Sequence, residues 1–248
     1  DGMCSDSEYG AMPDWDVSNV TNMYRAFRQD SNFNADISNW NVGNVSNMGE
    51  MFYNASSFNQ DIGNWNVGNV TKMSYMFNRA EEFNQDIGSW DVSSVTDMYG
   101  MFKLAKEFNQ GIGNWNVGNV TKMSYMFSGV EAGGFINFNQ DISTWDVSSV
   151  TDMEFMFGFA TSFNQEIGDW DVSNVTNMAY MFAYASSFNQ DISNWCVTNI
   201  DSEPDNFSTN SSLIESNKPV WGTCPTASID DQNQLDISIY PNPTNYKL

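Results

Sequence analysis

The feature that most constrains the fold is a repeat that occupies most of the chain. Its clearest marker is tryptophan, which recurs at Trp15, Trp40, Trp65, Trp90, Trp115, Trp145, Trp170 and Trp195. Six of the seven intervals are 25 residues and one is 30. A fixed period of about 20–50 residues is typical of arrays in which each repeat stacks on the next. We therefore predict an elongated stack of about seven similar units.

The unit that begins at Trp65, WNVGNVTKMSYMFNRAEEFNQDIGS, shows the local pattern. Between Val70 and Ala80 the fixed apolar residues are spaced 3, 3, 1 and 3 apart, which predicts a short helix with one buried face. From Ile87 to Val92 the fixed residues are bulky or β-branched, which predicts a short strand. The predicted fold class is therefore α/β, a solenoid of strand, turn and short helix units with parallel stacked strands.

One polar position repeats as strictly as the apolar ones. The residue after the second fixed phenylalanine is Asn34, Asn59, Asn84, Asn109, Asn139, Asn164 and Asn189 in successive units. An amide side chain both donates and accepts hydrogen bonds, so stacked copies can satisfy one another and the turn backbone. We interpret this column as a structural ladder, because seven equivalent residues do not make one catalytic site.

The irregular sequence at both ends divides the chain into parts. We expect an N-terminal cap at 1–12, the repeat stack at 13–200, a C-terminal cap at 201–229, and a linker with the start of a truncated module at 230–248. The chain begins without a signal peptide, so we expect that one was removed or that the sequence is a fragment.

Three cysteines give a further constraint. Cys196 takes a solvent-facing position of the last unit and Cys224 falls in the C-terminal cap, so we expect these two to form a disulfide. Cys4 belongs to the opposite end of the stack, beyond the roughly 7 Å between Cα atoms that a bridge can span. Disulfide use fits an extracellular compartment.

The charge and the residue composition of the chain exclude several classes of function. The net charge of −22 opposes binding to nucleic acid, whose phosphates would be repelled. The sequence has no histidine, which removes catalytic triads and histidine-based metal sites. No apolar run approaches the roughly 20 residues that span a bilayer. We expect a protein that is not an enzyme and that has no membrane span.

Repeated carboxylates leave two alternatives open. Asp146 and Asp171 share a position in adjacent units, and glycoside hydrolases use paired acids, but an open face offers such a pair little enclosure. The column that contains Asp141, Glu166 and Asp191 has the oxygen ligands that Ca²⁺ prefers, although no compact calcium-binding loop is present. We expect no catalytic residue, no metal ligand and no cofactor, with Ca²⁺ as the alternative.

The candidate binding residues are five aromatic residues and one isoleucine. Between the two fixed methionines the second variable residue is aromatic in four units, as Tyr75, Tyr125, Phe155 and Tyr180, and on a helix it would face away from the core. The 30-residue unit carries an insertion at 129–137 that would bring Phe135 and Ile136 to a protrusion. Exposed aromatic patches often mark binding surfaces, and tyrosines also suit glycans. Coverage by neighbouring turns, and a tolerated slip in the repeat, are the structural alternatives.

Two stretches resemble known families. The pattern NWDVSNVTNMSYMF followed by FNQDI, carried by the units of 13–200, resembles the BspA-like leucine-rich-repeat surface proteins. The likeness implies a right-handed leucine-rich-repeat-like solenoid, exposure at the cell surface, and adhesion or other protein binding. Tyr240, Pro241, Asn242 and Pro243 resemble the opening of the sorting domain of the type IX secretion system of Bacteroidota, which implies export across the outer membrane.

These observations together predict an extracellular or outer-surface repeat protein that mediates protein–protein binding or adhesion. Its expected partners are a protein at the cell surface and, through the C-terminal tail, the type IX secretion machinery. The first alternative is a carbohydrate-binding accessory module that uses the exposed aromatic residues on a glycan. A glycoside hydrolase is a distant third.

Overall fold

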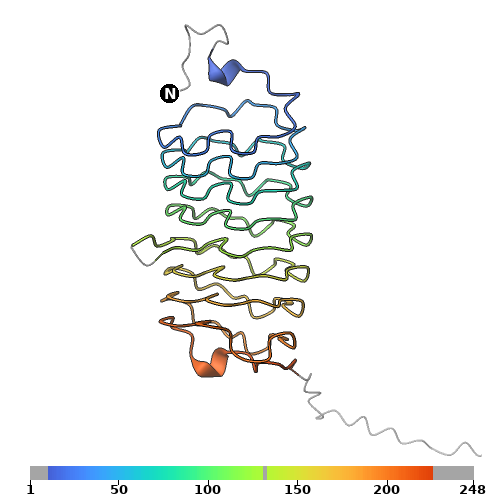
Figure 1. The fold of residues 1–248 in the computed structure, drawn as a ribbon, viewed down its shortest axis with the longest axis vertical. Helices are drawn as coiled ribbons and strands as arrows, with labels where there is room; N and C mark the ends of the chain where they lie inside the picture. The colour runs from blue at the N-terminus through green and yellow to red at the C-terminus, as the bar shows by residue number, and fades with distance from the viewer. Residues whose placement is uncertain (1–10, 131–132, 226–248) are drawn as a thin grey trace, which may run out of the picture.

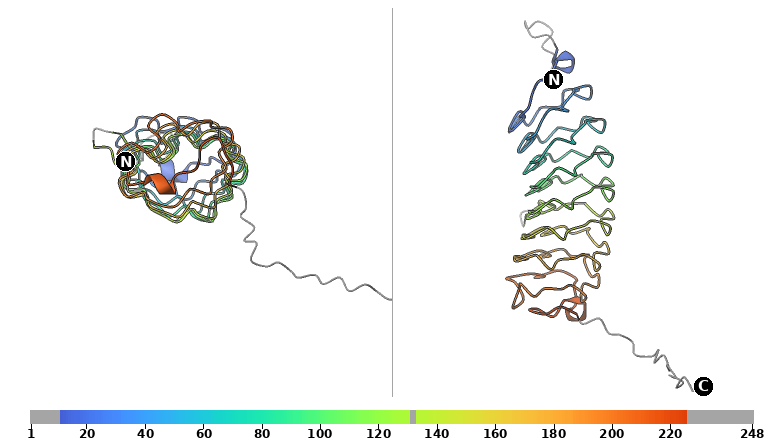
Figure 2. Two further views of the ribbon diagram at one scale, coloured as in Figure 1. Left: turned by 90° about the horizontal axis from the view of Figure 1, so that it is seen from below. Right: turned by 90° about the vertical axis from the view of Figure 1, so that its right-hand side faces the viewer.

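The protein winds into successive coils stacked along one long axis, as Figure 1 shows. This computed structural model describes residues 11–130 and 133–225. Seen along the axis, the coils superpose in one closed outline (Figure 2). The helices of the described residues are two single 3₁₀ turns, η1 (Met12–Asp14) and η2 (Glu215–Asn217), at opposite ends of the stack. No helix in these residues has the length and apolar character needed to cross a membrane.

Neighbouring coils are joined by isolated parallel β-bridges. The bridged residues, one per coil, are Asn22, Asn47, Lys72, Asp97, Lys122, Asp152 and Asn177. At each bridge one amide points to the next coil and one to the previous coil: Met73 donates to the Asp97 carbonyl (3.0 Å) and Thr96 donates to that of Thr71 (3.0 Å). Because Lys122 still pairs with Asp152, the five extra residues of the long repeat leave the register unchanged.

The short helix expected between Val70 and Ala80 is absent, and this prediction was wrong. The segment is a run of turns closed by bonds such as that from the Met76 amide to the Met73 carbonyl (3.1 Å). Intervening amides donate to the next coil, as that of Tyr75 does to the Tyr99 carbonyl (2.7 Å). An α-helix needs every amide for its own i−4 carbonyl, so a segment that shares its amides with a neighbour cannot form one.

The strand expected at 87–92 is also absent. The Ile87 carbonyl accepts the Trp90 amide, which closes a turn (3.1 Å), and the indole Nε1–H of Trp115 from the next coil (3.1 Å). The polar groups of this segment are thus satisfied by turns and side chains, and no strand ladder forms. The parallel pairing lies instead at the bridge column, next to the first fixed methionine.

The core is a set of aromatic columns that run along the axis. In one representative layer, the ring of Phe77 packs 4.0 Å from Phe83 in the same coil and 5.6 Å from Phe102 in the next, measured between centroids. All three rings are fully buried. Burial of one such side chain contributes roughly 1.5–3 kcal/mol, so the repeated columns hold together a stack that has almost no regular secondary structure.

The asparagine column forms a continuous ladder. The side-chain oxygen of Asn59 accepts the amide of Asn84 (3.0 Å), and that of Asn84 accepts the amide of Asn109 (3.0 Å). The same link joins all seven asparagines, and the last, Asn189, accepts the amide of Ile214 in the C-terminal segment (3.1 Å). The role is structural, as the repeat predicts.

The segment after Ile200 adds a further layer, although its sequence has lost the apolar period. The Phe182 amide donates to the Phe207 carbonyl (2.8 Å), which is the bond expected of a regular coil. Asn206 and Asn210 have positive φ values of 51° and 57°, four residues apart like the corresponding pair of every preceding coil from 25 to 104. This layer is covered by Trp221, whose ring meets Phe207 edge-on at 4.9 Å.

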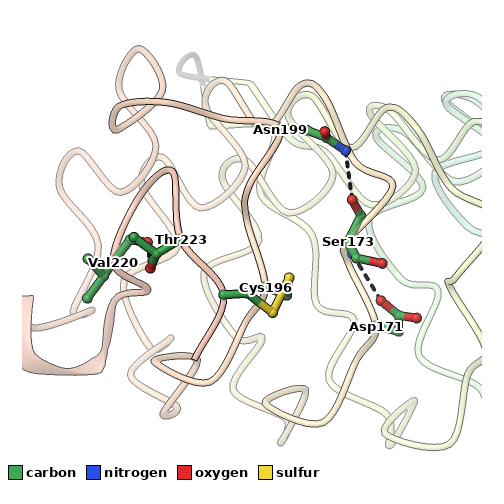
Figure 3. Close-up of a disulfide and its surroundings, with 7 residues drawn as sticks. Asp171, Ser173, Cys196, Asn199, Val220 and Thr223 are labelled. Atoms are coloured by element: carbon green, nitrogen blue, oxygen red, sulfur yellow. Dashed lines mark hydrogen bonds between the residues drawn. A yellow bond between two sulfur atoms is a disulfide. The ribbon is translucent and has the colours of Figure 1, made fainter. Parts of the chain in front are cut away.

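A disulfide closes this end of the stack. Cys196, in the last tryptophan unit, is bonded to Cys224, as the sequence suggests (Figure 3). Next to it, the Val197 amide donates to the Thr223 carbonyl (2.8 Å), so the bond lies where the cap pairs with the coil. Cys4 falls outside the described residues.

Candidate functional site

The candidate site depends on two backbone positions per coil that have positive φ. The first set is Arg25, Glu50, Tyr75, Gly100, Tyr125, Phe155 and Tyr180, and the second, four residues later, includes Gln29, Asn54, Arg79, Leu104, Phe159 and Tyr184. Each closes a turn at its third residue, a place that favours glycine or asparagine. The left-handed region costs other residues about 1–2 kcal/mol each. Turns, and not a helix, therefore place the aromatic residues on the surface.

The aromatic stripe is half-buried and interrupted. Tyr125, Phe155 and Tyr180 stack face to face, with centroids 5.0 Å and 4.4 Å apart and interplanar angles of 15° and 5°. Tyr75 is separated from this run by Gly100, where an added Cβ would lie 2.6 Å from the Tyr75 ring. The predicted stripe is therefore one stack of three rings, which Tyr99 links edge-on to Tyr75 (4.9 Å) and at a tilt to Tyr125 (5.5 Å).

A second aromatic column lies beside the first, and the sequence reasoning missed it. Phe159 and Tyr184 stack at 4.5 Å with an interplanar angle of 6°. They line a hollow of about 430 Å³ together with the three stacked rings and Val130 of the insertion. The available signal was the recurrence of aromatic residues four positions after the stripe in the same two units. We call these five rings and the hollow the aromatic face.

The insertion is tied together by backbone pairing between two of its described residues. Val130 and Gly134 exchange backbone hydrogen bonds of 3.0 and 3.3 Å in an antiparallel bridge. Phe135 is exposed, at 46% of its surface, as expected. Ile136 is fully buried in the core cluster, so the expectation that it protrudes was wrong. At this side of the coil the backbone passes the core, and an isoleucine there gains more from burial than from contact with water.

Cationic side chains line the neighbouring hollow, which measures about 370 Å³. Arg25 and Arg28 pair there with one carboxylate, that of Glu50, at 2.9 and 2.7 Å. Arg79 is exposed and Lys103 is half-buried. Neither has a carboxylate oxygen within 4.0 Å in the described part of the chain.

Lys103 joins the cationic hollow to the aromatic face. Its ammonium lies 4.4 Å from the centroid of the Tyr125 ring, a cation–π contact. Burial, and then the charge of Arg79, lower the pKa of Lys103. Burial raises the pKa of Tyr125, whose hydroxyl also donates to Glu154 (2.8 Å). The site therefore places a phenol that resists ionisation beside Lys103, whose charged form is disfavoured.

The repeated aspartates close turns. Asp91 accepts the amide and the hydroxyl of Ser93, at 3.1 and 2.6 Å, and these bonds lower the pKa of its carboxyl. Asp171 accepts the amide of Ser173 in the same way (Figure 3). Within residues 11–130 and 133–225, no three histidine, cysteine or acidic side chains are grouped so as to hold a metal ion.

The geometry defines a class of protein, a stack of turn-rich coils with an aromatic and cationic face. A protein-family model described as "Mycoplasma protein of unknown function, DUF285" matches residues 3–110, 61–136 and 105–221. The chain belongs to this family, whose repeats cover most of its length. No curated protein and no solved structure matches the chain. The sorting-motif candidates Tyr240, Pro241, Asn242 and Pro243 lie outside the described residues.

Proposed function

We propose that this chain is a non-enzymatic surface protein that binds a partner protein through its aromatic face. The observation that carries the proposal is the placement of Tyr125, Phe155 and Tyr180 at positive φ. Glycine or asparagine would relax these turns, and the chain itself uses Gly100 at the equivalent position and Asn54 at the second positive-φ position of its coil. Stacking of about 0.5–1.5 kcal/mol per pair offsets part of the backbone cost, and contact with a partner accounts for the half-exposed surface.

The stacked geometry favours a protein over a glycan. A sugar packs its C–H face on an open aromatic face, but the faces of Phe155 are covered by Tyr125 and Tyr180. One face of Tyr125 is covered in addition by Lys103. The rings therefore present mainly edges and hydroxyls, which suit the mixed apolar and polar surface of a protein partner.

We place this protein outside the cell or at its outer surface. The Cys196–Cys224 disulfide is the structural feature that supports this location, since disulfides persist in oxidising compartments. Export by a type IX-like route, and contact with its machinery, remain proposals based on the sequence from Tyr240 to Pro243. We propose no catalytic residue and no resident cofactor.

The experiment that tests the proposal is cross-linking of the purified protein to intact cell-surface fractions of its source, followed by mass spectrometry and reconstitution with the purified partner. A triple variant, Tyr125→Asn, Phe155→Asn and Tyr180→Asn, removes the stack while keeping residues that suit positive φ. Phe135→Ser is the matched control, because it removes an exposed aromatic ring outside the stack.

We expect the triple variant to lose the reconstituted binding and Phe135→Ser to keep it, with equal thermal stability checked by circular dichroism. Unchanged binding by a folded triple variant would refute the aromatic face as the binding site. Recovery of polysaccharide alone would favour the carbohydrate-binding module. Loss of binding in chelator would indicate a calcium requirement.

A further inference from the structure

The distribution of positive charge points to a more specific partner. The chain has nine lysines and arginines against a net charge of −22. Four of the nine line one hollow: Arg25, Arg28, Arg79 and Lys103. This hollow therefore holds the side chains of nearly half of the cations of a strongly acidic chain. That hollow and the aromatic one share two lining residues, Lys103 and Val130, so together they form one groove across several coils.

The four cations are not equivalent. Glu50 pairs with Arg25 and Arg28, so that corner of the groove carries an internal counter-charge. Arg79 and Lys103 lack such a partner among the described residues, and Glu154, whose charge acts on Lys103, accepts the Tyr125 hydroxyl. Two like charges, one of them half-buried, stand next to each other without a carboxylate.

This arrangement costs free energy in the isolated protein. Burial of an ammonium and repulsion by a neighbouring guanidinium both disfavour the charged form, and both lower the pKa of Lys103. Acidic side chains are abundant in the chain, yet none of the described ones forms an ion pair with Arg79 or Lys103. An anion from outside would offset the repulsion, and a guanidinium binds a carboxylate with two parallel hydrogen bonds.

We propose that an acidic peptide segment of the partner protein lies along this groove, with its carboxylates against Arg79 and Lys103 and its apolar side chains against the aromatic face. The inference rests on the proposed binding face and names the chemistry of its occupant. A peptide fits both halves of the groove, because the exposed ring edges carry partial positive charge and favour carboxylates and backbone carbonyls. A small anion would use only the cationic half.

The test uses two synthetic decapeptides, one of alternating Glu and Phe and one of alternating Gln and Phe, titrated calorimetrically at about 0.15 M salt. At that ionic strength the Debye length is about 8 Å, which screens long-range repulsion by the acidic chain. The variant is Arg79→Gln with Lys103→Gln. The matched control is Lys72→Gln with Lys122→Gln, which removes the same charge from two exposed positions of the bridge column.

We expect the Glu peptide to bind the wild type at least about tenfold more tightly than the Gln peptide, as charged hydrogen bonds in a half-buried site predict. The Arg79 and Lys103 variant should lose this preference and the control should keep it. Equal binding of both peptides, or a preference that survives the variant, overturns the inference. If the aromatic triple variant abolishes that equal binding, the aromatic face is still the binding site and only the inference of an acidic peptide fails. If the protein binds dextran sulfate and does not bind the Glu peptide, the inference is also overturned, and an anionic glycan is favoured instead.

Discussion

The asparagine ladder allows a quantitative test of what holds the coils together. In the structure the side-chain oxygen of Asn84 accepts the Asn109 amide (3.0 Å) and the Gln110 side-chain amide (2.9 Å). Asn84→Ala removes this acceptor. The Asn109 amide, part-buried between coils, then has no protein partner, whereas Gln110 keeps the Asn84 carbonyl (2.9 Å).

The expected loss follows from these contacts. A buried amide left without an acceptor costs about 1–3 kcal/mol, and partial access of water to Asn109 places this case in the lower half of the range. Loss of the Gln110 bond adds about 0.5–1 kcal/mol, because that side chain retains one acceptor. We therefore expect Asn84→Ala to lower the free energy of unfolding by about 2 kcal/mol. Asn84→Asp retains the acceptor oxygen and should recover most of the loss.

The assay is urea unfolding followed by tryptophan fluorescence, with the free energy obtained by linear extrapolation. The control is Asn114→Ala, an exposed asparagine of the next coil that has no side-chain hydrogen bond in the described structure. Surface substitutions of this kind usually change stability by less than about 0.5 kcal/mol. If Asn84→Ala and Asn114→Ala unfold at the same urea concentration, the ladder is not a source of stability and the reasoning fails.

Two further predictions concern single side chains. Gly100→Ala should destabilise the protein by about 1–3 kcal/mol and disturb the Tyr75 signals in an NMR spectrum, because φ is +58° and the new Cβ would lie 2.6 Å from that ring; unchanged stability and spectra would contradict this. The bonds from Ser93 lower the pKa of Asp91, so its contribution to stability is present above the unfolded value of 3.8 and is lost as the pH falls through the folded value. Asp91→Asn should therefore make unfolding less sensitive to acid, as measured by circular dichroism, and an identical acid profile would contradict it.

The sequence is sufficient to predict the stacking because identical residues recur at identical intervals. A column of asparagines can only satisfy one another if the repeats lie in register, which is what the bond between Asn59 and Asn84 shows. The disulfide was predictable for a related reason, since Cys196 and Cys224 both belong to the end of the stack. These conclusions needed the order of the units and not the conformation inside them.

The local conformation was not predictable from the apolar spacing. Spacings of 3 and 1 between Val70 and Ala80 are compatible with an α-helix and also with linked turns in which each hydrogen bond joins residues three positions apart. The deciding factor is where the amides donate, and that depends on a neighbouring coil. The layer at 201–213 was not predicted because most of its fixed apolar residues are absent. Its backbone still follows the path of a coil, with positive φ at Asn206 and Asn210 and hydrogen bonds to the preceding coil.

The residues at the positive-φ positions differ in kind along the stack. At Asn54, Gly100 and Asn206 the chain uses the residues that a positive φ favours. At Phe155 and Tyr180 it uses aromatic residues, and their stacking recovers only part of a backbone cost of about 1–2 kcal/mol. Arg25, Glu50 and Arg79 also occupy positive-φ positions, so what distinguishes this face is the aromatic character of its residues. Five of the six aromatic residues at these positions line one hollow beside Lys103, which is why we propose binding at this face.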